Sequence, residues 1–120
     1  MSIKIALLDD HQIVVDGLKL LLKGQTNMQV ILENTNGWLL LEDLKENKVD
    51  ILLTDIMMPS IDGYEMAMMM KTHFPTVKII ALSMNGEGEL IEKMINQAEV
   101  LGYLLKTANK TELIRAIELV

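Results

Sequence analysis

The sequence contains no cysteine and very little arginine, proline or aromatic side chain. Its 120 residues include two prolines, two tyrosines, one tryptophan, one phenylalanine and a single arginine, Arg115. The lack of cysteine excludes disulfides and thiolate chemistry and is compatible with a reducing compartment. A net charge of −6 with one arginine is unlike the basic patches of nucleic-acid binders. We therefore expect no direct nucleic-acid binding by this chain.

Long hydrophobic runs and a secretion signal are also missing. The N-terminus, Met-Ser-Ile-Lys-Ile, lacks the charged and long apolar regions of a signal peptide. No apolar run approaches the roughly 20 residues that a membrane span needs. The composition, 50% hydrophobic and 23% charged, is typical of one globular domain. We expect a cytoplasmic protein that is not associated with a membrane.

Short apolar runs alternate with stretches in which apolar residues recur at helical spacing. The predicted strands are residues 3–8, 28–32, 51–53, 77–82 and 101–105, and a helix is predicted after each. Gly24 ends the first helix, Asn36-Gly37 opens the second, and Asn109 is a candidate cap of the fifth. Strict alternation predicts an α/β fold with a five-stranded parallel sheet covered on both faces. The flavodoxin-like strand order 2-1-3-4-5 is the expected topology.

Polar side chains stand where four of these strands end, and the carboxyl ends of strands 1, 3, 4 and 5 meet at one edge of such a sheet. The residues concerned are Asp9, Asp10, Asp55, Ser83 and Lys106. Carboxylates held together repel one another unless a cation neutralises them, and an all-oxygen ligand set suits Mg²⁺. A hydroxyl and an ammonium beside them would bind phosphoryl oxygens. The sharpest hypothesis is formation of an acyl phosphate on Asp55.

At these residues the chain resembles the receiver domain of bacterial two-component response regulators over essentially its whole length. The matching motifs are Leu-Leu-Asp9-Asp10-His11, Asp55-Ile-Met-Met-Pro59, Gly63, Ala81-Leu82-Ser83 and Gly102-Tyr103-Leu-Leu-Lys106. Each motif alone has little specificity, but all five in this order are highly specific. The first and last look most like the LuxR/NarL-type subfamily. The resemblance implies a CheY-like three-layer (βα)5 sandwich.

The resemblance also implies roles for individual residues. Asp55 would be the phosphoacceptor. Asp10 and the backbone carbonyl of Met57 would be direct Mg²⁺ ligands, with Asp9 a ligand mainly through water. The phosphoryl donor in the family is a phosphohistidine on a sensor histidine kinase, for which small acyl phosphates substitute.

A switch follows from the same resemblance. Ser83 and Lys106 would hold the phosphoryl oxygens, and Tyr103 would change rotamer on phosphorylation. The chain would be a single receiver domain, residues 1–120, excised from a longer response regulator whose C-terminal helix-turn-helix domain controls transcription. Homodimer formation is a further expectation. The chain would not be an enzyme beyond its own phosphorylation and dephosphorylation.

Two loop positions depart from the family pattern. Thr107 follows Lys106 where the family usually has a proline after a cis peptide bond, so either this bond is cis or the loop differs. Glu99-Val100 replaces a Gly-Ala pair before the last strand, and a residue forced there into positive φ would cost about 1–2 kcal/mol.

Other readings of the same residues stay open. Asp55-Ile-Met-Met superficially resembles haloacid dehalogenase-class phosphatases, but these need an aspartate at the position of Met57. Flavin binding would fit the fold, yet Asp9-Asp10 would repel a flavin phosphate. A degenerate receiver that binds partners without phosphorylation is the main alternative function.

Three side chains in or near these motifs also have structural interpretations that involve no function. His11 is interpreted as a neutral loop or capping residue in preference to a metal ligand. For Tyr103, packing is at least as good an interpretation as switching. Trp38 is assigned to packing of the second helix or to an exposed contact.

Overall fold

The computed structural model describes residues 2–56, 58, 61–83, 88–98 and 100–120. Five strands and five helices alternate along these residues. In chain order the elements are β1 Ile3–Leu8, α1 Gln12–Leu22, β2 Met28–Asn34, α2 Gly37–Leu44, β3 Ile51–Asp55, α3 Gly63–His73, β4 Lys78–Ser83, α4 Gly88–Ala98, β5 Gly102–Leu105 and α5 Lys110–Leu119.

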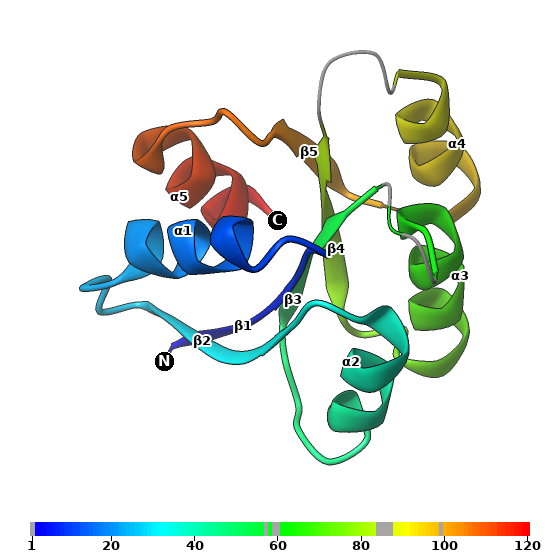
Figure 1. The fold of residues 1–120 in the computed structure, drawn as a ribbon, viewed down its shortest axis with the longest axis horizontal. Helices are drawn as coiled ribbons and strands as arrows, with labels where there is room; N and C mark the ends of the chain where they lie inside the picture. Colours follow the sequence, from blue (N-terminus) through cyan, green and yellow to red (C-terminus); the bar gives the residue numbers. More distant parts are fainter. Residues whose placement is uncertain (1, 57, 59–60, 84–87, 99) are drawn as a thin grey trace.

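The strands form one parallel sheet in the order β2-β1-β3-β4-β5, which confirms the predicted topology. Helices α1 and α5 cover one face of the sheet, and α2, α3 and α4 cover the other (Figure 1). This arrangement follows from right-handed crossovers. When successive strands are added in one direction across the sheet, the connecting helices lie on one face, and when the direction of addition reverses they lie on the opposite face. The reversal occurs at β1, so the ends of β1 and β3 form the edge where such folds bind ligands.

Element boundaries differ from the predicted ones by one or two residues. Strand β2 continues to Asn34, beyond the predicted end at Leu32, and β3 includes Asp55 as its last residue. Strand β4 is shifted one residue along, so Ser83 is inside it. Asn34, Asp55 and Ser83 still make ladder contacts, because the sheet register continues past the last apolar residue of these three strands.

Alternating side chains of the central strands feed two separate apolar cores. Ala6, Leu8 and Leu52 pack in the core beneath α2, α3 and α4, whereas Leu7 and Leu53 pack in the core beneath α1 and α5. At the middle of the sheet these residues are completely inaccessible to solvent. The central strands are therefore held rigidly from both sides, and the loops at their ends project from a fixed frame.

Side-chain caps define where three helices begin. Asn36 accepts hydrogen bonds from the backbone of Trp38 and Leu39 at the start of α2. Asp62 with Glu65 at α3, and Asn109 with Glu112 at α5, form capping boxes. The predicted cap at Asn109 is thus confirmed. Gly24 follows α1 with a φ of +86°, a left-handed conformation that glycine adopts without strain.

The two unusual loop positions have different outcomes. There are no cis peptide bonds in the described parts of the chain, so the bond between Lys106 and Thr107 is trans. The prediction of strain before the last strand concerns Glu99, which lies outside the described residues. Among the described helices, none combines the length and apolar character needed to cross a bilayer.

Candidate functional site

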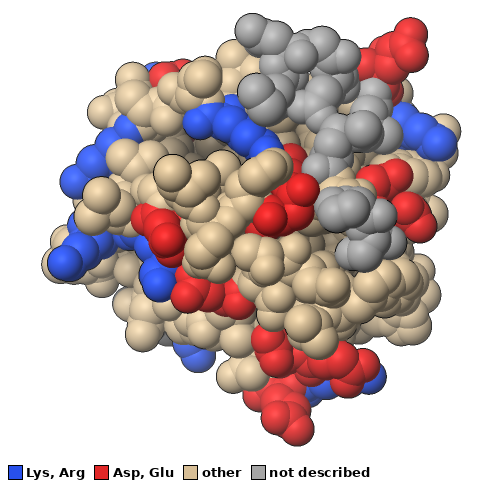
Figure 2. All heavy atoms as spheres, viewed as in Figure 1, with Lys and Arg blue, Asp and Glu red and all other residues tan. Residues whose placement is uncertain are grey.

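The site is built at the carboxyl ends of the central strands. Asp9 and Asp10 directly follow β1, and Asp55 ends the neighbouring strand β3. Ser83 ends β4, and Lys106 follows β5, where its backbone N–H donates to the Ser83 carbonyl at 2.8 Å. The sequence prediction that these strand ends lie along one edge is therefore correct. In the space-filling view an acidic patch lies near the middle of one face, beside a basic side chain (Figure 2).

Lys106 connects the acidic residues of two strands. Its ammonium lies 3.0 Å from Asp9 Oδ2 and 2.9 Å from Asp55 Oδ1. Only 15% of the Lys106 side chain is exposed, and Asp9 is completely buried. Ion pairs in such surroundings are screened much less than surface pairs. One positive charge nevertheless faces three carboxylates, so the edge keeps an excess of negative charge.

The two oxygens of Asp55 have different surroundings. Oδ1 accepts the N–H of Ile56 at 2.8 Å and the Lys106 ion pair. Oδ2 is buried and has no hydrogen-bond partner within the part of the chain that is described. The hydroxyl of Ser83, also fully buried, is in the same condition. Buried polar atoms are normally satisfied, so this pair marks a place prepared for a ligand.

The charge distribution shifts the proton affinities of this edge. Burial raises the pKa of the Asp55 carboxyl to about 6; Lys106 opposes the rise, and the neighbouring carboxylates of Asp10 and Asp9 add to it. Burial also acts to raise the pKa of Asp10, but interactions with Asp55, His11 and Lys106 hold it below its usual value. The pKa of Lys106 is above its ordinary range: burial acts to lower it, but the carboxylates of Asp55 and Asp9 prevail. Two carboxyl groups close together are thus driven apart in acidity.

Gly63 allows the chain after Asp55 to return tightly to the strand. Its N–H donates to the carbonyl of Ile56 at 2.6 Å. A Cβ at this position would lie 2.6 Å from the Asp55 carbonyl oxygen and 2.7 Å from the Ile56 Cα. Such distances are incompatible with any side chain unless the backbone moves. The start of α3 is therefore fixed directly against the backbone of Asp55, a contact that sequence reasoning did not identify.

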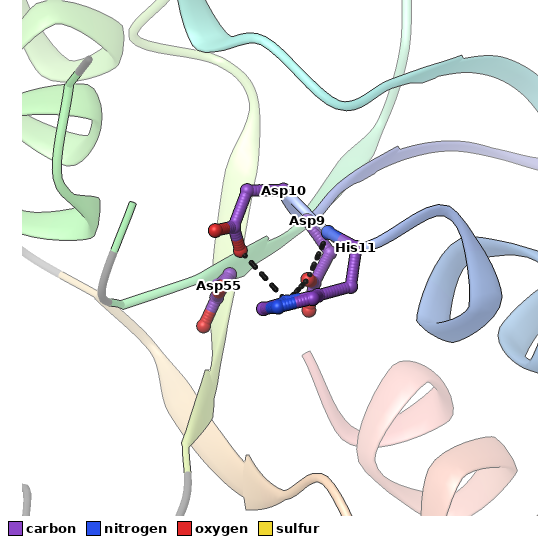
Figure 3. Close-up of side chains that lie close together, drawn as sticks. All are labelled: Asp9, Asp10, His11 and Asp55. Carbon is purple, nitrogen blue, oxygen red and sulfur yellow. Dashed lines mark hydrogen bonds and ion pairs between the residues drawn. The ribbon is translucent and has the colours of Figure 1, made fainter. Parts of the chain in front are cut away.

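His11, interpreted from the sequence as a neutral loop or capping residue, belongs to the same cluster. It occupies the position before α1 but makes no side-chain cap hydrogen bond. Its Nδ1 lies 3.1 Å from Asp10 Oδ1 and 3.4 Å from Asp9 Oδ1. Figure 3 shows the ring between these carboxylates, with Asp55 pointing into the same space from β3. One ligand atom from each of Asp9, Asp10, His11 and Asp55 falls within 4.8 Å of the others.

Two predicted site residues are not part of this cluster. Met57, expected to offer its backbone carbonyl to Mg²⁺, lies outside the described residues. Tyr103 lies on β5 with 53% of its surface exposed, so the interpretation as a packing residue is not supported. Trp38 is also half exposed, in agreement with an exposed contact. The structure brings together the three aspartates and Lys106, and Ser83 joins them through its backbone contact with Lys106.

The donor set fits a hard divalent cation. Asp9, Asp10 and Asp55 supply carboxylate oxygens close together, and no described residue donates a hydrogen bond to the buried Asp55 Oδ2. Oxygen-rich sites with several carboxylates are typical of Mg²⁺ and Mn²⁺. A cation here would neutralise the charge that Lys106 leaves uncompensated.

The fold and this edge are those of a receiver-type signalling domain. A crystal structure of the non-phosphorylated receiver domain of the stress response regulator RcsB from Escherichia coli superimposes with a TM-score of 0.89, at 27% identity over 98% of this chain and 92% of that one. The description of the family whose sequence model matches residues 5–118 is response regulator receiver domain. The chain belongs to this family, as its motifs predicted.

Curated relatives agree with this assignment. The chain is 32% identical over 118 residues to the response regulator GacA of Pseudomonas syringae, covering 98% of this chain and 55% of that protein. It is 35% identical over 116 residues to the transcriptional regulatory protein YxjL of Bacillus subtilis, covering 97% and 53%. The chain thus spans about half the length of the curated relatives it matches. The relatives are response regulators of the LuxR/NarL type, and receiver domains are signalling domains of two-component systems.

Proposed function

We propose that this chain is a phosphoacceptor receiver in which Asp55 takes a phosphoryl group from a sensor histidine kinase. The observation that carries the proposal is the asymmetry of the Asp55 carboxylate. Its Oδ1 is fixed by Ile56 and Lys106, while its buried Oδ2 has no hydrogen-bond partner among the described residues. A nucleophile that is oriented through one oxygen and free at the other matches what attack on phosphorus requires.

The reaction transfers one phosphoryl group from the kinase to Asp55, and no proton is taken up or released in the transfer itself. Asp55 Oδ2 attacks the phosphorus of the donor phosphohistidine, and a P–O bond forms as the P–N bond breaks. The electron pair of the P–N bond stays on the imidazole nitrogen of the kinase. A Mg²⁺ ion held by Asp9, Asp10 and Asp55 would supply charge neutralisation for the phosphoryl oxygens.

Lys106 and Ser83 would respond to the product. In the structure described above, the Lys106 ammonium is held by the carboxylates of Asp9 and Asp55. An aspartyl phosphate offers it more negative charge, and it offers the buried Ser83 hydroxyl an acceptor. Both interactions would act at the ends of β4 and β5, and β5 also carries the exposed Tyr103. We assign to this region the change that switches a partner surface.

The wider setting is inferred from the family. We assign this receiver to the cytoplasm, in a longer response regulator with a C-terminal helix-turn-helix domain that controls transcription. Its partners would be the sensor kinase, that output domain and a second copy of the chain. Support comes from the relatives, of which one is named a transcriptional regulatory protein and another, RcsB, is described in complex with DNA.

The test is intact-mass spectrometry after incubation with acetyl phosphate, with and without Mg²⁺. We expect a gain of about 80 Da, one phosphoryl group, that requires Mg²⁺ and is absent from Asp55→Asn. Asp43→Asn, which changes an exposed aspartate on α2, is the matched control and should be labelled like the parent.

Two outcomes would contradict the proposal. Labelling that persists in Asp55→Asn would place the phosphoryl group elsewhere. A folded protein that gains no mass under any condition would instead be the degenerate receiver that acts through protein contacts. Lys106→Ala should still bind Mg²⁺ but lose the phosphorylation-dependent change in chemical shifts of β4 and β5, and an unaltered change would refute the role given to Lys106.

A further inference from the structure

His11 contributes an imidazole nitrogen to a cluster otherwise made of oxygens. Its Nδ1 lies 3.1 Å from Asp10 Oδ1 and 3.4 Å from Asp9 Oδ1 (Figure 3). The ring is 65% exposed, so the side chain is not placed there by packing. Nor does it cap α1, the role expected of a residue in this position. The backbone N–H of His11 donates to Asp9 Oδ1 at 2.9 Å, which fixes the residue at the site independently of its ring.

The distances suit a shared cation. When each bond to an octahedral ion is about 2.1 Å, neighbouring ligand atoms at right angles stand about 3.0 Å apart and opposite ones about 4.2 Å apart. The separation of 3.1 Å between His11 and Asp10 matches that between neighbouring ligands, and the whole set of four ligand atoms spans at most 4.8 Å. A small contraction would therefore place all four around one ion.

An independent observation shows that this space is prepared for a ligand. Asp55 is 2% exposed, and its Oδ2 has no hydrogen-bond partner in the described parts of the chain. The fully buried hydroxyl of Ser83 also has no partner among the residues that the structure describes. These atoms are on β3 and β4, separate from the carboxylates that contact His11. Asp55, with its buried oxygen that has no partner among the described residues, therefore belongs to the same cluster as His11, whose ligand atom lies within 4.8 Å of one from Asp55.

We infer that His11 Nδ1 is a direct ligand of the cation bound by Asp9, Asp10 and Asp55. The inference rests on the proposed function, because it concerns the same cation site. Imidazole nitrogen suits Mn²⁺, Co²⁺ and Ni²⁺, whereas Mg²⁺ prefers oxygen. A site with three carboxylates and one imidazole therefore discriminates in favour of transition metals more strongly than three carboxylates alone. His11 sets which divalent ion this receiver uses.

Calorimetric titration of the metal-free protein with NiCl₂ and with MgCl₂ tests the inference. We expect His11→Asn to weaken Ni²⁺ binding at least about tenfold, because loss of residues that merely support a metal ligand already costs about that much, and to weaken Mg²⁺ binding much less. The readout is the dissociation constant for Ni²⁺ divided by that for Mg²⁺. A general loss of stability would weaken both and leave this ratio unchanged. His73→Asn is the matched control, since the exposed His73 on α3 is the other histidine of the chain, and it should leave the ratio unchanged.

Proton NMR of the Co²⁺ form gives a direct signature. A ligand bound through Nδ1 leaves its Nε2–H exposed to solvent, and this proton should appear as an exchangeable signal shifted far from the normal range. It should be present in the parent and in His73→Asn, and absent from His11→Asn. Circular dichroism of each variant shows that the comparison is made between folded proteins.

The outcomes separate this inference from the proposed function. An unchanged ratio in His11→Asn together with Mg²⁺-dependent labelling of Asp55 would overturn the ligand role alone. Loss of the shifted signal in His73→Asn instead of His11→Asn would overturn it too. A selective loss of Ni²⁺ affinity in His11→Asn and a shifted His11 signal, in a protein that is never labelled by acetyl phosphate, would uphold the metal ligand and overturn the phosphoacceptor function.

Discussion

Leu53 and Asp55 stand two residues apart on β3 and project toward the same face of the sheet. Both are essentially buried, at 0% and 2% exposure. Leu53 packs among the apolar side chains beneath α1 and α5, whereas Asp55 faces two other carboxylates and one ammonium. Burial stabilises the first and raises the pKa of the second. The interior of the strand stabilises the fold by apolar burial. Its last residue is a buried carboxylate, which costs stability when it is ionised.

The largest effect should come from emptying the interior. Leu53→Ala removes completely buried methyl groups and leaves a cavity in a rigid sheet, so we expect the free energy of unfolding to fall by about 3–4 kcal/mol. Urea titration measures this change. Leu20→Ala is the control because Leu20 is 71% exposed on α1, and it should change stability by less than about 0.5 kcal/mol. Equal effects from the two variants would contradict the assigned core.

Burial of Leu53 stabilises the fold, whereas burial of the ionised Asp55 carboxylate should destabilise it, and only within a defined pH range. Because its pKa is raised to about 6 in the folded protein from an ordinary value of 3.8, the folded state binds a proton more tightly than the unfolded state. Stability is therefore favoured by this group below about pH 4 and declines as the pH rises toward 6. The full difference is about 3 kcal/mol at neutral pH.

Asp55→Asn removes this titration. In metal-free buffer near pH 7 the variant should be more stable than the parent by about 1–3 kcal/mol, and the gain should shrink as the pH approaches 4. Chemical denaturation of both proteins across this range gives the measurement. A variant less stable than its parent at neutral pH would mean that the charge of Asp55 is better compensated than its contacts indicate.

The tight return after Asp55 should respond to a single methyl group. Gly63→Ala would bring a Cβ to 2.6 Å from a backbone oxygen, so backbone atoms must move, and we expect a loss of about 1–3 kcal/mol. Gly17→Ala is the same substitution on α1, where no atom lies within 4 Å, and helix propensity should stabilise that variant by up to about 1 kcal/mol. Thermal melting of the pair distinguishes the two. Similar shifts for both would refute the close approach.

The smallest effect is expected for an exposed polar contact between α3 and α4. Tyr64 on α3 donates its hydroxyl proton to Gln97 Oε1 at 2.8 Å, and Lys93 lies 4.3 Å from the centre of its ring. Tyr64→Phe keeps the ring and removes an exposed hydrogen bond, so about 0.5–1 kcal/mol should be lost. Tyr103→Phe on the exposed face of β5 is the control and should be nearly neutral. A larger loss from Tyr103→Phe would reveal a contact of its hydroxyl.

The order of strands could be predicted because it depends on chain-wide regularities. Five apolar runs alternating with helical patterns leave few parallel topologies, and the polar residue after each run identifies the edge of the sheet. The convergence of Asp9, Asp55 and Lys106 follows from that geometry alone. Helix starts were predictable only where the cap is a local signal, as at Asn109.

What sequence reasoning missed depends on contacts between segments. Nothing local to Gly63 indicates that its Cα passes over the backbone of Asp55, because the distance is set by the path of the chain between β3 and α3. His11 has the sequence position of a cap, and only the direction of its ring toward Asp10 shows otherwise. The exposure of Tyr103 depends on the position of β5 at the edge of the sheet, which is a property of the whole topology.

The interior position of β1 also has a consequence for the order in which the protein is made on the ribosome. The strand emerges first, but it pairs with β2 on one side and with β3 on the other. One of its edges therefore stays open until residues 51–55 have been synthesised. From then on each new strand is added to one side only, β4 to β3 and β5 to β4. Of the five strands of this sheet, the one that leads into Lys106 is thus made last, and its detachment would leave the other four paired.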